Sequence, residues 1–589
     1  MKSLACTGRE TLGEDARIAS PDGHCLFWDG RLDNRTELRA NLGVDLDERG
    51  DTASSDGALV MALCRRDGLA RTLPRLIGDW ALAFWDPHSR QWSLARDFAG
   101  VRPLYYTRTP DGYRWSFTLD ALLSASRHPR PLDRRYLAGL FFLGPDPAAT
   151  PYEGIECVPP AHVVTIEDER VHCQPFWTPP TGRRIQYRQD SDYEEHFRAL
   201  VREAVRCRLD STQPAWAFLS GGLDSSSIVC LADDLIASGD ARARTLHTIT
   251  YVFEPSPVTG ERRFCAAVER RRGQDSHYLE TTMYPYLRPR PGDGSPVPYL
   301  LDGSIALAQA QKTLMQRLGG QVLLCGSGGD ELLGNSRRGE RVLADRLRHY
   351  EWHAFGRGLR EWSVSLRRPA LTLLGQTLAS VPRRRVRPFP SGPPPWLAPA
   401  FLDVIRDPAS VTRTPALRDW PSSLRSVVAR TAQQDYRSLC GCDVRYPFLD
   451  RRLVEFCLSL PLEQLTRPGE TRSLMRRSLR GIVPETVLSR RSKNLPAEPI
   501  GAAVDREWER LTRLFSRPLL EQYDLVHAPA LDQSLRRARH GTEKFLGPLL
   551  WAIVLEEWLQ QASARQWLLP PASRQAHEAW LQLKREGHV

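Results

Sequence analysis

The chain has 589 residues, which is enough for two or more domains that each bury a core. Its formal charge is +11, but the basic residues, of which only five are lysines, are spread along the chain without interleaved aromatic residues, so we expect no nucleic-acid partner. An arginine-biased genome explains the charge best, and otherwise ATP, pyrophosphate or an acidic peptide would satisfy it. The 12 scattered cysteines predict neither a zinc site nor a disulfide framework. Without a signal core or a membrane-length apolar run, we expect a cytoplasmic protein with no membrane partner.

The first part of the chain is rich in strand patterns. Trp80–Asp86, Trp92–Arg96 and Tyr113–Phe117 are apolar or alternating runs separated by turn signals. A polar stretch with two prolines follows at residues 178–190, and Tyr193–Arg208 then has helical spacing. The sequence therefore predicts a first domain over residues 1–177, a linker over residues 178–190 and a second domain over residues 191–589.

The second domain opens with a loop suited to pyrophosphate. Ala215–Leu219 is a short apolar strand, and apolar residues recur at helical spacing from Ile228 to Leu235. The residues around the loop that we predict to bind the nucleotide are Phe218, Ser220, Gly221, Gly222, Asp224, Ser225 and Ser226. The glycines let the backbone turn and present N–H groups to an anion at a helix start. Asp224 would repel phosphate unless it held Mg²⁺, so ATP with Mg²⁺ is predicted; an ordinary turn with a serine cap is the structural alternative.

Two further buried strands are predicted at Thr245–Phe253 and Gln321–Cys325. Helical patterns alternate with them, which favours a parallel sheet covered by helices, and ligands of such sheets bind beyond the carboxyl ends of the strands. The last strand runs into Gly326, Ser327 and then Asp330. We therefore predict that Gly326 and Ser327 contact the nucleotide and that Asp224 and Asp330 share one Mg²⁺.

The order of these motifs, completed by Asp443–Asp450, resembles the synthetase domain of the asparagine synthetase superfamily. Three segments of the first domain are similar to the same family's glutaminase domain: Asp29–Asn34, Gly78–Asp86 and Ala95–Tyr106. The resemblance implies an α+β domain followed by an α/β domain. The first would be a class II glutamine amidotransferase-like αββα sandwich of the N-terminal-nucleophile type, and the second an ATP-pyrophosphatase domain that cleaves ATP to AMP and pyrophosphate.

The glutaminase pattern fails at its reacting positions. The family uses a cysteine at the mature N-terminus, whereas position two is Lys2 and Cys6 could serve only after further processing. The family's Asn-Gly-Glu is replaced by Asp29, Gly30 and Arg31, and an aspartate would repel an oxyanion. An arginine motif for the glutamine carboxylate has no match in the first fifty residues. We therefore predict a degenerate domain that keeps the fold without glutamine hydrolysis.

Three positions in the synthetase domain bear on the second half-reaction. Lys493 stands out in an arginine-rich chain and is our candidate for the cation that stabilises the tetrahedral intermediate, with a stray surface lysine as the alternative. Ser327 stands where ammonia-using relatives carry glutamate and β-lactam synthetases carry tyrosine. Asp443 stands where the family places glutamate, and it would act as a base or orient Lys493, or else make a structural contact to Arg445.

The resemblance is strongest to the branch that forms lasso peptide macrolactams. We expect the chain to adenylate an Asp or Glu side-chain carboxyl of a core peptide and to close it onto the peptide's N-terminal amine. An insertion over about residues 335–438 would enlarge the pocket, or would only pack or be disordered. This branch implies a leader peptidase and a precursor-recognition protein as partners. The alternatives are a β-lactam synthetase, an ammonia-dependent asparagine synthetase and a noncatalytic homologue.

Overall fold

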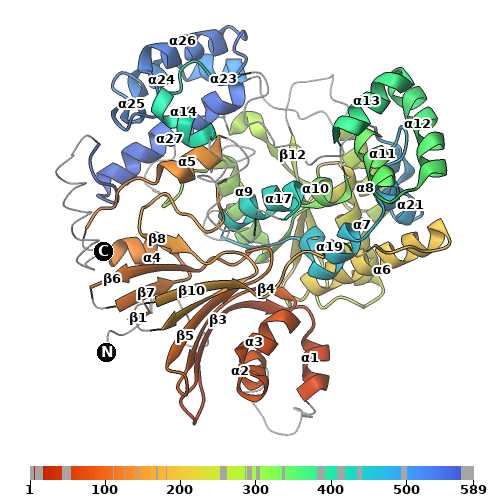
Figure 1. Cartoon of the computed structure of the whole chain (residues 1–589), viewed down its shortest axis with the longest axis horizontal. Helices are drawn as coiled ribbons and strands as arrows, with labels where there is room; N and C mark the ends of the chain where they lie inside the picture. Colours follow the sequence, from red (N-terminus) through yellow and green to blue (C-terminus); the bar gives the residue numbers. More distant parts are fainter. Residues whose placement is uncertain are drawn as a thin grey trace.

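The chain folds into three β-sheets covered by helices (Figure 1). The computed structural model describes residues 5–6, 17–42, 55–110, 112–126, 128–141, 145–167, 170–180, 182, 184–252, 262–284, 287, 295–299, 305–334, 339–380, 392–406, 417, 420–433, 441–491 and 500–571.

Two sheets stack face to face in the first domain. The six-stranded sheet has the order β10 (Arg170–Pro175), β9 (His162–Glu167), β5 (Gln91–Arg96), β4 (Gly78–Asp86), β3 (Cys25–Leu32), β2 (Arg17–Ala19). The four-stranded sheet has the order β1 (Ala5–Cys6), β7 (Gly112–Ser116), β6 (Tyr105–Thr109), β8 (Ile155–Cys157). The helices outside them are α1 (Arg35–Leu42), α2 (Asp56–Asp67), α3 (Leu69–Thr72), η2 (Leu73–Arg75), α4 (Leu119–Ser124) and α5 (Arg134–Leu140).

Strand β4 shows why these layers form. Its side chains alternate between the two faces of the sheet, as the strand geometry requires. Leu82 and Phe84 belong to the core shared with α2, while Ala81 and Ala83 belong to the core between the sheets, together with Trp115 of β7. The sheets are therefore enclosed between helical layers, and the expected αββα sandwich is confirmed.

The second domain is built on a parallel sheet. Its strands lie in the order β13 (His277–Glu280), β12 (Leu246–Val252), β11 (Ala215–Phe218), β14 (Val322–Leu324), β15 (Asp443–Arg445), and every pairing is parallel. The expected α/β sheet is confirmed. Its helices are α6 (Asp190–Arg208), α7 (Leu223–Ala237), α8 (Arg262–Arg272), η3 (Thr281–Met283), α9 (Ile305–Leu318), α10 (Gly329–Leu333), η4 (Pro447–Leu449), α19 (Arg451–Leu458), α20 (Leu462–Leu465), α21 (Ser473–Ser478) and α22 (Glu485–Leu488).

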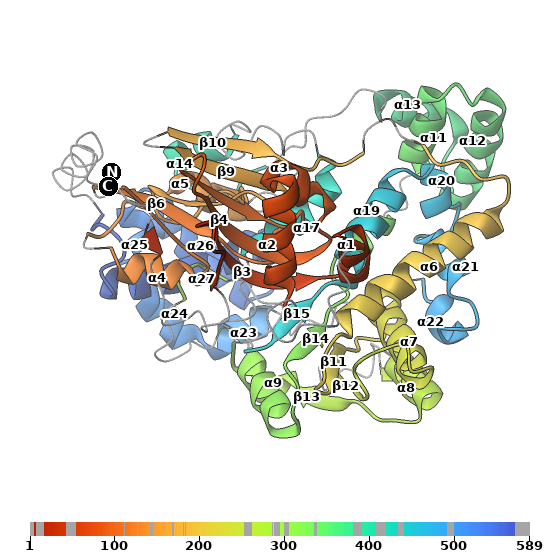
Figure 2. The ribbon, with the colours of Figure 1, turned by 90° about the horizontal axis from the view of Figure 1, so that it is seen from below.

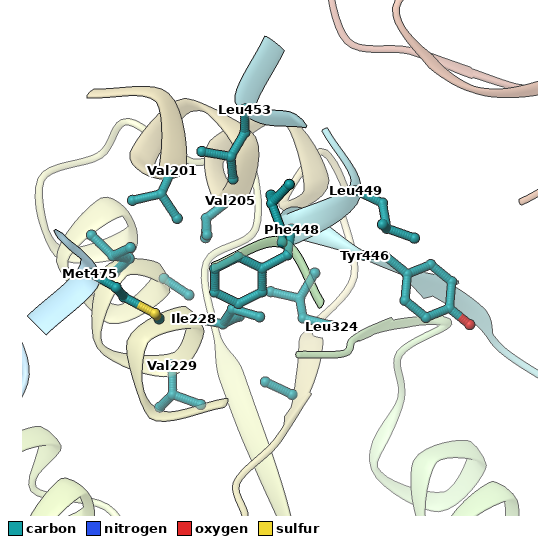
Figure 3. Packing of buried hydrophobic residues seen from close by; sticks show 14 of the residues in the cluster. Val201, Val205, Ile228, Val229, Leu324, Tyr446, Phe448, Leu449, Leu453 and Met475 are labelled. Carbon is teal, nitrogen blue, oxygen red and sulfur yellow. The ribbon is translucent and has the colours of Figure 1, made fainter. Parts of the chain in front are cut away.

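Phe448 lies in the core that joins this sheet to its helices. Figure 3 shows its ring between Val205 of α6 and Ile228 of α7, with Leu324 of β14 beneath it. The side chain is completely buried. The apolar stripes of α6 and α7 thus meet over the strand ends, and this packing fixes the helix that follows the predicted nucleotide loop.

The predicted insertion contains packed helices, among them α11 (Gly339–Arg348), α12 (Trp352–Leu366), α13 (Ala370–Ser380), α14 (Pro399–Arg406) and α17 (Ser422–Gln433). Helices α11 to α13 enclose a small core of their own around Trp362 and Leu373. Their outer surface exposes several large apolar side chains: Tyr350, Trp352, Val364, Leu371 and Leu378. In the part that the structure describes, the insertion is folded rather than disordered.

The C-terminal helices lie against the first domain, above α5 in Figure 1. They are α23 (Ile500–Arg506), α24 (Trp508–Leu514), α25 (Leu519–Gln522), α26 (Ala528–Arg539) and α27 (Leu546–Ala564). Trp558 of α27 meets the ring of Tyr152, and both belong to a core that also contains Leu137 of α5. Helix α27 therefore packs across the domain boundary. Among the described helices, none combines the length and the apolar character needed to cross a membrane.

A buried group of charges joins the two domains. Arg208, at the end of α6, is only 1% exposed and lies within 3.0 Å of Asp450 and 3.3 Å of Asp33. Asp79 is 3.8 Å away, and Arg31 forms ion pairs with both Asp33 and Asp79. Three buried carboxylates of the two domains thus share the Arg208 guanidinium, with Arg31 and Arg452 as their other partners. Removing Arg208 would leave them buried and only partly compensated.

We predict that Arg208→Met lowers the free energy of unfolding by about 3–5 kcal/mol, because breaking a buried ion pair strands its partners. The matched control is Arg206→Met on the same helix, since Arg206 is 45% exposed and pairs with Glu203 at 2.6 Å. That change should cost less than about 1 kcal/mol. Urea denaturation followed by tryptophan fluorescence measures both, and equal midpoints for the two variants would contradict the prediction.

The same network predicts acid sensitivity. Burial alone would raise the pKa of Asp450, but hydrogen bonds and charge from Arg452 and Arg208 lower it to about 2. Because the folded-state pKa lies below the unfolded value of about 3.9, the stabilisation is complete above that value and is lost as the pH falls toward 2. Wild type should lose about 2 kcal/mol more between pH 4 and 2 than Asp450→Asn, which keeps the helix cap. Asp403→Asn, at an exposed position on α14, is the control, and its free energy of unfolding should fall by the same amount as that of wild type between pH 4 and 2.

Candidate active site

The predicted pyrophosphate loop joins β11 to α7 at the carboxyl end of the sheet. Gly221 has φ +63°, and a Cβ atom there would lie 2.8 Å from the Cβ atom of Phe264, so only glycine fits. Ser225 closes the loop: its Oγ accepts a hydrogen bond from the Ser220 N–H at 3.1 Å and lies 3.3 Å from the Gly222 carbonyl. Helix α7 begins directly after Gly222, so its positive end faces the loop.

Asp224 and Asp330 converge on one cation, the side chain of Arg472. The Nη1 atom of Arg472 lies 2.8 Å from both carboxylate oxygens of Asp224 and 2.9 Å from Oδ1 of Asp330. The two aspartates lie in the first turns of α7 and α10, the helices that follow the neighbouring strands β11 and β14. The structure therefore brings together the two residues that the sequence predicts as metal ligands.

Close backbone contact makes this convergence possible. A Cβ atom on Gly329 would lie 2.7 Å from Cγ of Asp224, and one on Gly326 would lie 3.3 Å from its Cβ. The absence of side chains at these two positions lets the turn after β14 approach the start of α7.

The donor set fits Mg²⁺. Two carboxylates from the first turns of α7 and α10 supply the hard oxygen ligands that this ion prefers. Their shared contact with a single nitrogen shows that one small cation can reach both. Arg472 holds the position of that cation in the present conformation. Asp224 and Asp330 would hold the metal, which would neutralise negative charge on the phosphates of ATP.

Two arginines of the site are not predicted by any local sequence pattern. Arg472 has φ +53°, an unusual backbone conformation, but in the sequence it is one arginine among many. Arg490 donates a hydrogen bond from Nη1 to the Gly221 carbonyl at 3.0 Å and stacks over the ring of Phe264 at 4.3 Å. Both reach the loop from segments about 250 residues later in the chain, so no local pattern reports their position.

The remaining predicted nucleotide residues lie around the same strand ends. Phe218 is the last residue of β11 and packs edge-on against Tyr251. Ser327 is exposed after β14, with its Oγ 3.2 Å from Sγ of Cys325. Ser226 is fully buried, so a nucleotide contact through its hydroxyl would require the loop to open. The roles of these residues remain predictions.

Asp443 does not lie at the loop. It begins β15 opposite Val322, the first residue of β14, and thus stands at the amino end of the sheet. It forms ion pairs with Arg102 of the first domain and with Arg445 at 2.8 Å. Burial alone would raise its pKa, but these two arginines hold the pKa of Asp443 well below its usual range. The structural contact to Arg445 is present, whereas the role of a base is not favoured by these surroundings. Lys493, the other predicted catalytic residue, lies outside the described residues.

The altered glutaminase motif lies in β3 at the domain boundary. Gly30 is required there, because a Cβ atom would lie 2.3 Å from the Asp79 carbonyl oxygen. Arg31 follows it and is held by Asp33 and, at 2.7 Å, by Asp79. The side chain in the place of the family's glutamate is thus part of the charge network between the domains. Cys6 lies within β1, opposite Trp115.

Two protein-family models match the chain. The asparagine synthase model matches residues 196–560, and a glutamine amidotransferase domain model matches residues 4–177. The chain belongs to the asparagine synthase family. Membership in the asparagine synthase family, together with the loop and its two aspartates, supports an ATP-dependent ligase that forms carbon–nitrogen bonds.

Three curated relatives illustrate the range of the asparagine synthase family. Asparagine synthetase (glutamine-hydrolyzing) 3 of Bacillus subtilis is 28% identical over 216 residues, covering 36% of this chain and 34% of the relative. Amidase chry2 of Gibberella zeae is 29% identical over 233 residues, covering 37% of this chain and 34% of the relative. Asparagine synthetase (glutamine-hydrolyzing) 1 of B. subtilis is 24% identical over 508 residues, covering 80% and 75%. The match thus spans about a third of the first two relatives and three quarters of the third.

We predict that Gly329→Ala lowers the rate of ATP–pyrophosphate exchange at least tenfold, because the added methyl group would displace the Asp224 carboxylate. The cost follows from positioning, since small misplacements of reacting groups slow catalysis strongly. Gly375→Ala on α13 is the matched control: nothing lies within 4 Å of its Cβ position, and activity should be unchanged. Equal exchange rates in the two variants would contradict this assignment.

Proposed function

We propose that the chain is an ATP- and Mg²⁺-dependent ligase that forms the macrolactam of a lasso peptide. An Asp or Glu side-chain carboxylate of a core peptide attacks the α-phosphorus of ATP and releases pyrophosphate. The peptide's own N-terminal amine then attacks the acyl-adenylate, loses a proton and releases AMP.

The loop around Gly221 supports the first step. The start of α7 directs its positive end at the phosphates, and Arg490 holds the loop from its outer side through the Gly221 carbonyl. Asp224 and Asp330 would hold the Mg²⁺, which neutralises charge on the leaving pyrophosphate. Arg472 forms ion pairs with both carboxylates.

The position of Arg31 is the observation that supports an attacking amine on the substrate itself. Its guanidinium is committed to Asp33 and Asp79 in the charge network between the domains, where the family's glutaminases use a glutamate to contact glutamine. Because Arg31 replaces the residue that would contact glutamine and is held in ion pairs, the first domain would not bind glutamine or release ammonia from it. The adenylate therefore needs another amine, and an amine on the same substrate is already at high effective concentration.

The insertion supports a bulky substrate. Its helix α17 lies beside α10 (Figure 1), and Arg430 of α17 forms an ion pair with Glu331, the residue after Asp330. The insertion thus borders the adenylation site directly. A peptide would use such additional walls, whereas a small β-amino acid would not. The proposal further implies a leader peptidase and a precursor-recognition protein as partners, because the amine must be freed before the ring closes.

The test uses purified full-length chain with ATP, Mg²⁺ and leader-free core peptides. A peptide with an acceptor Asp or Glu should stimulate ATP–pyrophosphate exchange and yield a product lighter by one water. Lys493→Ala and Lys493→Arg should each lower product formation at least tenfold while pyrophosphate exchange persists, because the cation is needed only when the oxyanion forms. Lys544→Ala, at an exposed position, is the control and should keep both activities.

Other outcomes separate the alternatives. ATP–pyrophosphate exchange with a small β-amino acid would indicate a β-lactam synthetase. Exchange with aspartate, followed by asparagine formation from ammonia, would indicate an asparagine synthetase. Measurable glutamine hydrolysis would contradict the assigned role of Arg31. Absence of exchange with every acceptor would leave a noncatalytic homologue.

A further inference from the structure

Two turns of the first domain meet at the end of the sheet that lies away from the second domain. Cys25 of β3 pairs with Trp85 of β4, so His24 lies opposite Asp86. Leu32 and Gly78 pair at the other end of the same strands, next to the residues that contact Arg208. The turns are thus about eight residues from the domain boundary, or roughly 25 Å along the strands. Figure 2 shows β3 and β4 within the sheet between α2 and the inner layer.

Three side chains at these turns surround one point. The Nε2 atom of His24 lies 3.6 Å from Oδ1 of Asp86, and the Nδ1 atom of His88 lies 3.4 Å from the same oxygen. One ligand atom from each residue lies within 4.8 Å of the other two. A tetrahedral Zn²⁺ with bonds of about 2.0–2.2 Å needs neighbouring ligand atoms about 3.3–3.6 Å apart. The two separations from Oδ1 of Asp86, 3.6 and 3.4 Å, meet this requirement, and the two histidine atoms lie within 4.8 Å of each other.

The ligands are supported from behind. Nδ1 of His24 lies 3.0 Å from Oδ1 of Asp22 without a hydrogen bond between them, and a carboxylate in this position can orient a metal-binding histidine. Arg65 holds Oδ2 of that aspartate at 2.8 Å, and His24 is only 9% exposed. Asp86 is fixed as well, because its Oδ2 accepts a hydrogen bond from the Ser89 hydroxyl at 2.9 Å. With Nδ1 of His24 near Asp22, the Nε2 atom of the same ring faces Asp86 and the site between the three side chains.

We propose that His24, Asp86 and His88 form a Zn²⁺ site that ties the β2–β3 turn to the β4–β5 turn. Two imidazole nitrogens and one carboxylate oxygen are ligands that zinc accepts. His88 is 76% exposed, so the fourth position faces solvent. The site is separate from the adenylation loop, and it acts on the stability of the first domain rather than on the ligase reaction.

The experiment uses full-length chain without a histidine tag, stripped with EDTA and then freed of the chelator. Zn²⁺ is titrated against a chromophoric competitor, and Co²⁺ provides a visible spectrum that reports tetrahedral coordination. His88→Ala removes an exposed ligand and so leaves folding intact. Asp22→Asn keeps all three ligands but removes the supporting carboxylate. His277→Ala is the control, because His247 and His277 form the other close imidazole pair among the described residues, at 3.4 Å.

Wild type and His277→Ala should each bind one Zn²⁺ per chain and show the tetrahedral Co²⁺ spectrum. His88→Ala should bind at least tenfold more weakly, and Asp22→Asn about 10–100-fold more weakly. Zinc should raise the thermal unfolding midpoint of wild type but not of His88→Ala, since binding only the folded state stabilises it. Wild-type affinity in either His88→Ala or Asp22→Asn, or loss of binding in His277→Ala instead, would overturn the proposal.

Discussion

The ion pairs of Arg208 are the interaction on which the arrangement of the chain depends. Arg208 ends α6, shortly before β11 and the nucleotide loop, and its guanidinium is shared by Asp450 of its own domain and Asp33 of the first. Buried charges are tolerated only when they are paired, so neither domain can leave this contact without exposing or stranding its carboxylates. The position of β11, and with it that of the loop, is thereby fixed relative to the first domain.

The first domain keeps its αββα layers although its Asp29-Gly30-Arg31 segment departs from the family pattern. The αββα layers depend on alternating side chains such as those of β4, and this alternation is independent of the reacting residues. Arg31 then extends the charge network into the place of a substrate contact. The C-terminal helices share their core with α5.

At the carboxyl end of the parallel sheet, one arginine balances the charge of two carboxylates. Arg472 pairs with both Asp224 and Asp330, which allows the two carboxylates to lie close together. Gly329 permits this approach by leaving room for the Asp224 carboxylate. The remote turns at His24 and Asp86 use comparable elements, a carboxylate between cationic or metal-binding groups, but there the groups serve only to hold two hairpins together.

The sequence by itself determined the features that local rules govern. The strand, loop and helix around Gly221 follow from apolar periodicity and from the turn that glycine allows, and the adjacency of Asp224 and Asp330 follows from the parallel order of neighbouring strands. Only the tertiary structure decided which charges meet across long separations. Arg472 at Asp224, Arg490 at Gly221, and Asp443 between Arg102 and Arg445 all join segments that no local pattern connects. In a chain with so many arginines, a guanidinium acquires its role from the carboxylate or carbonyl that folding places beside it, because the residue type is the same everywhere.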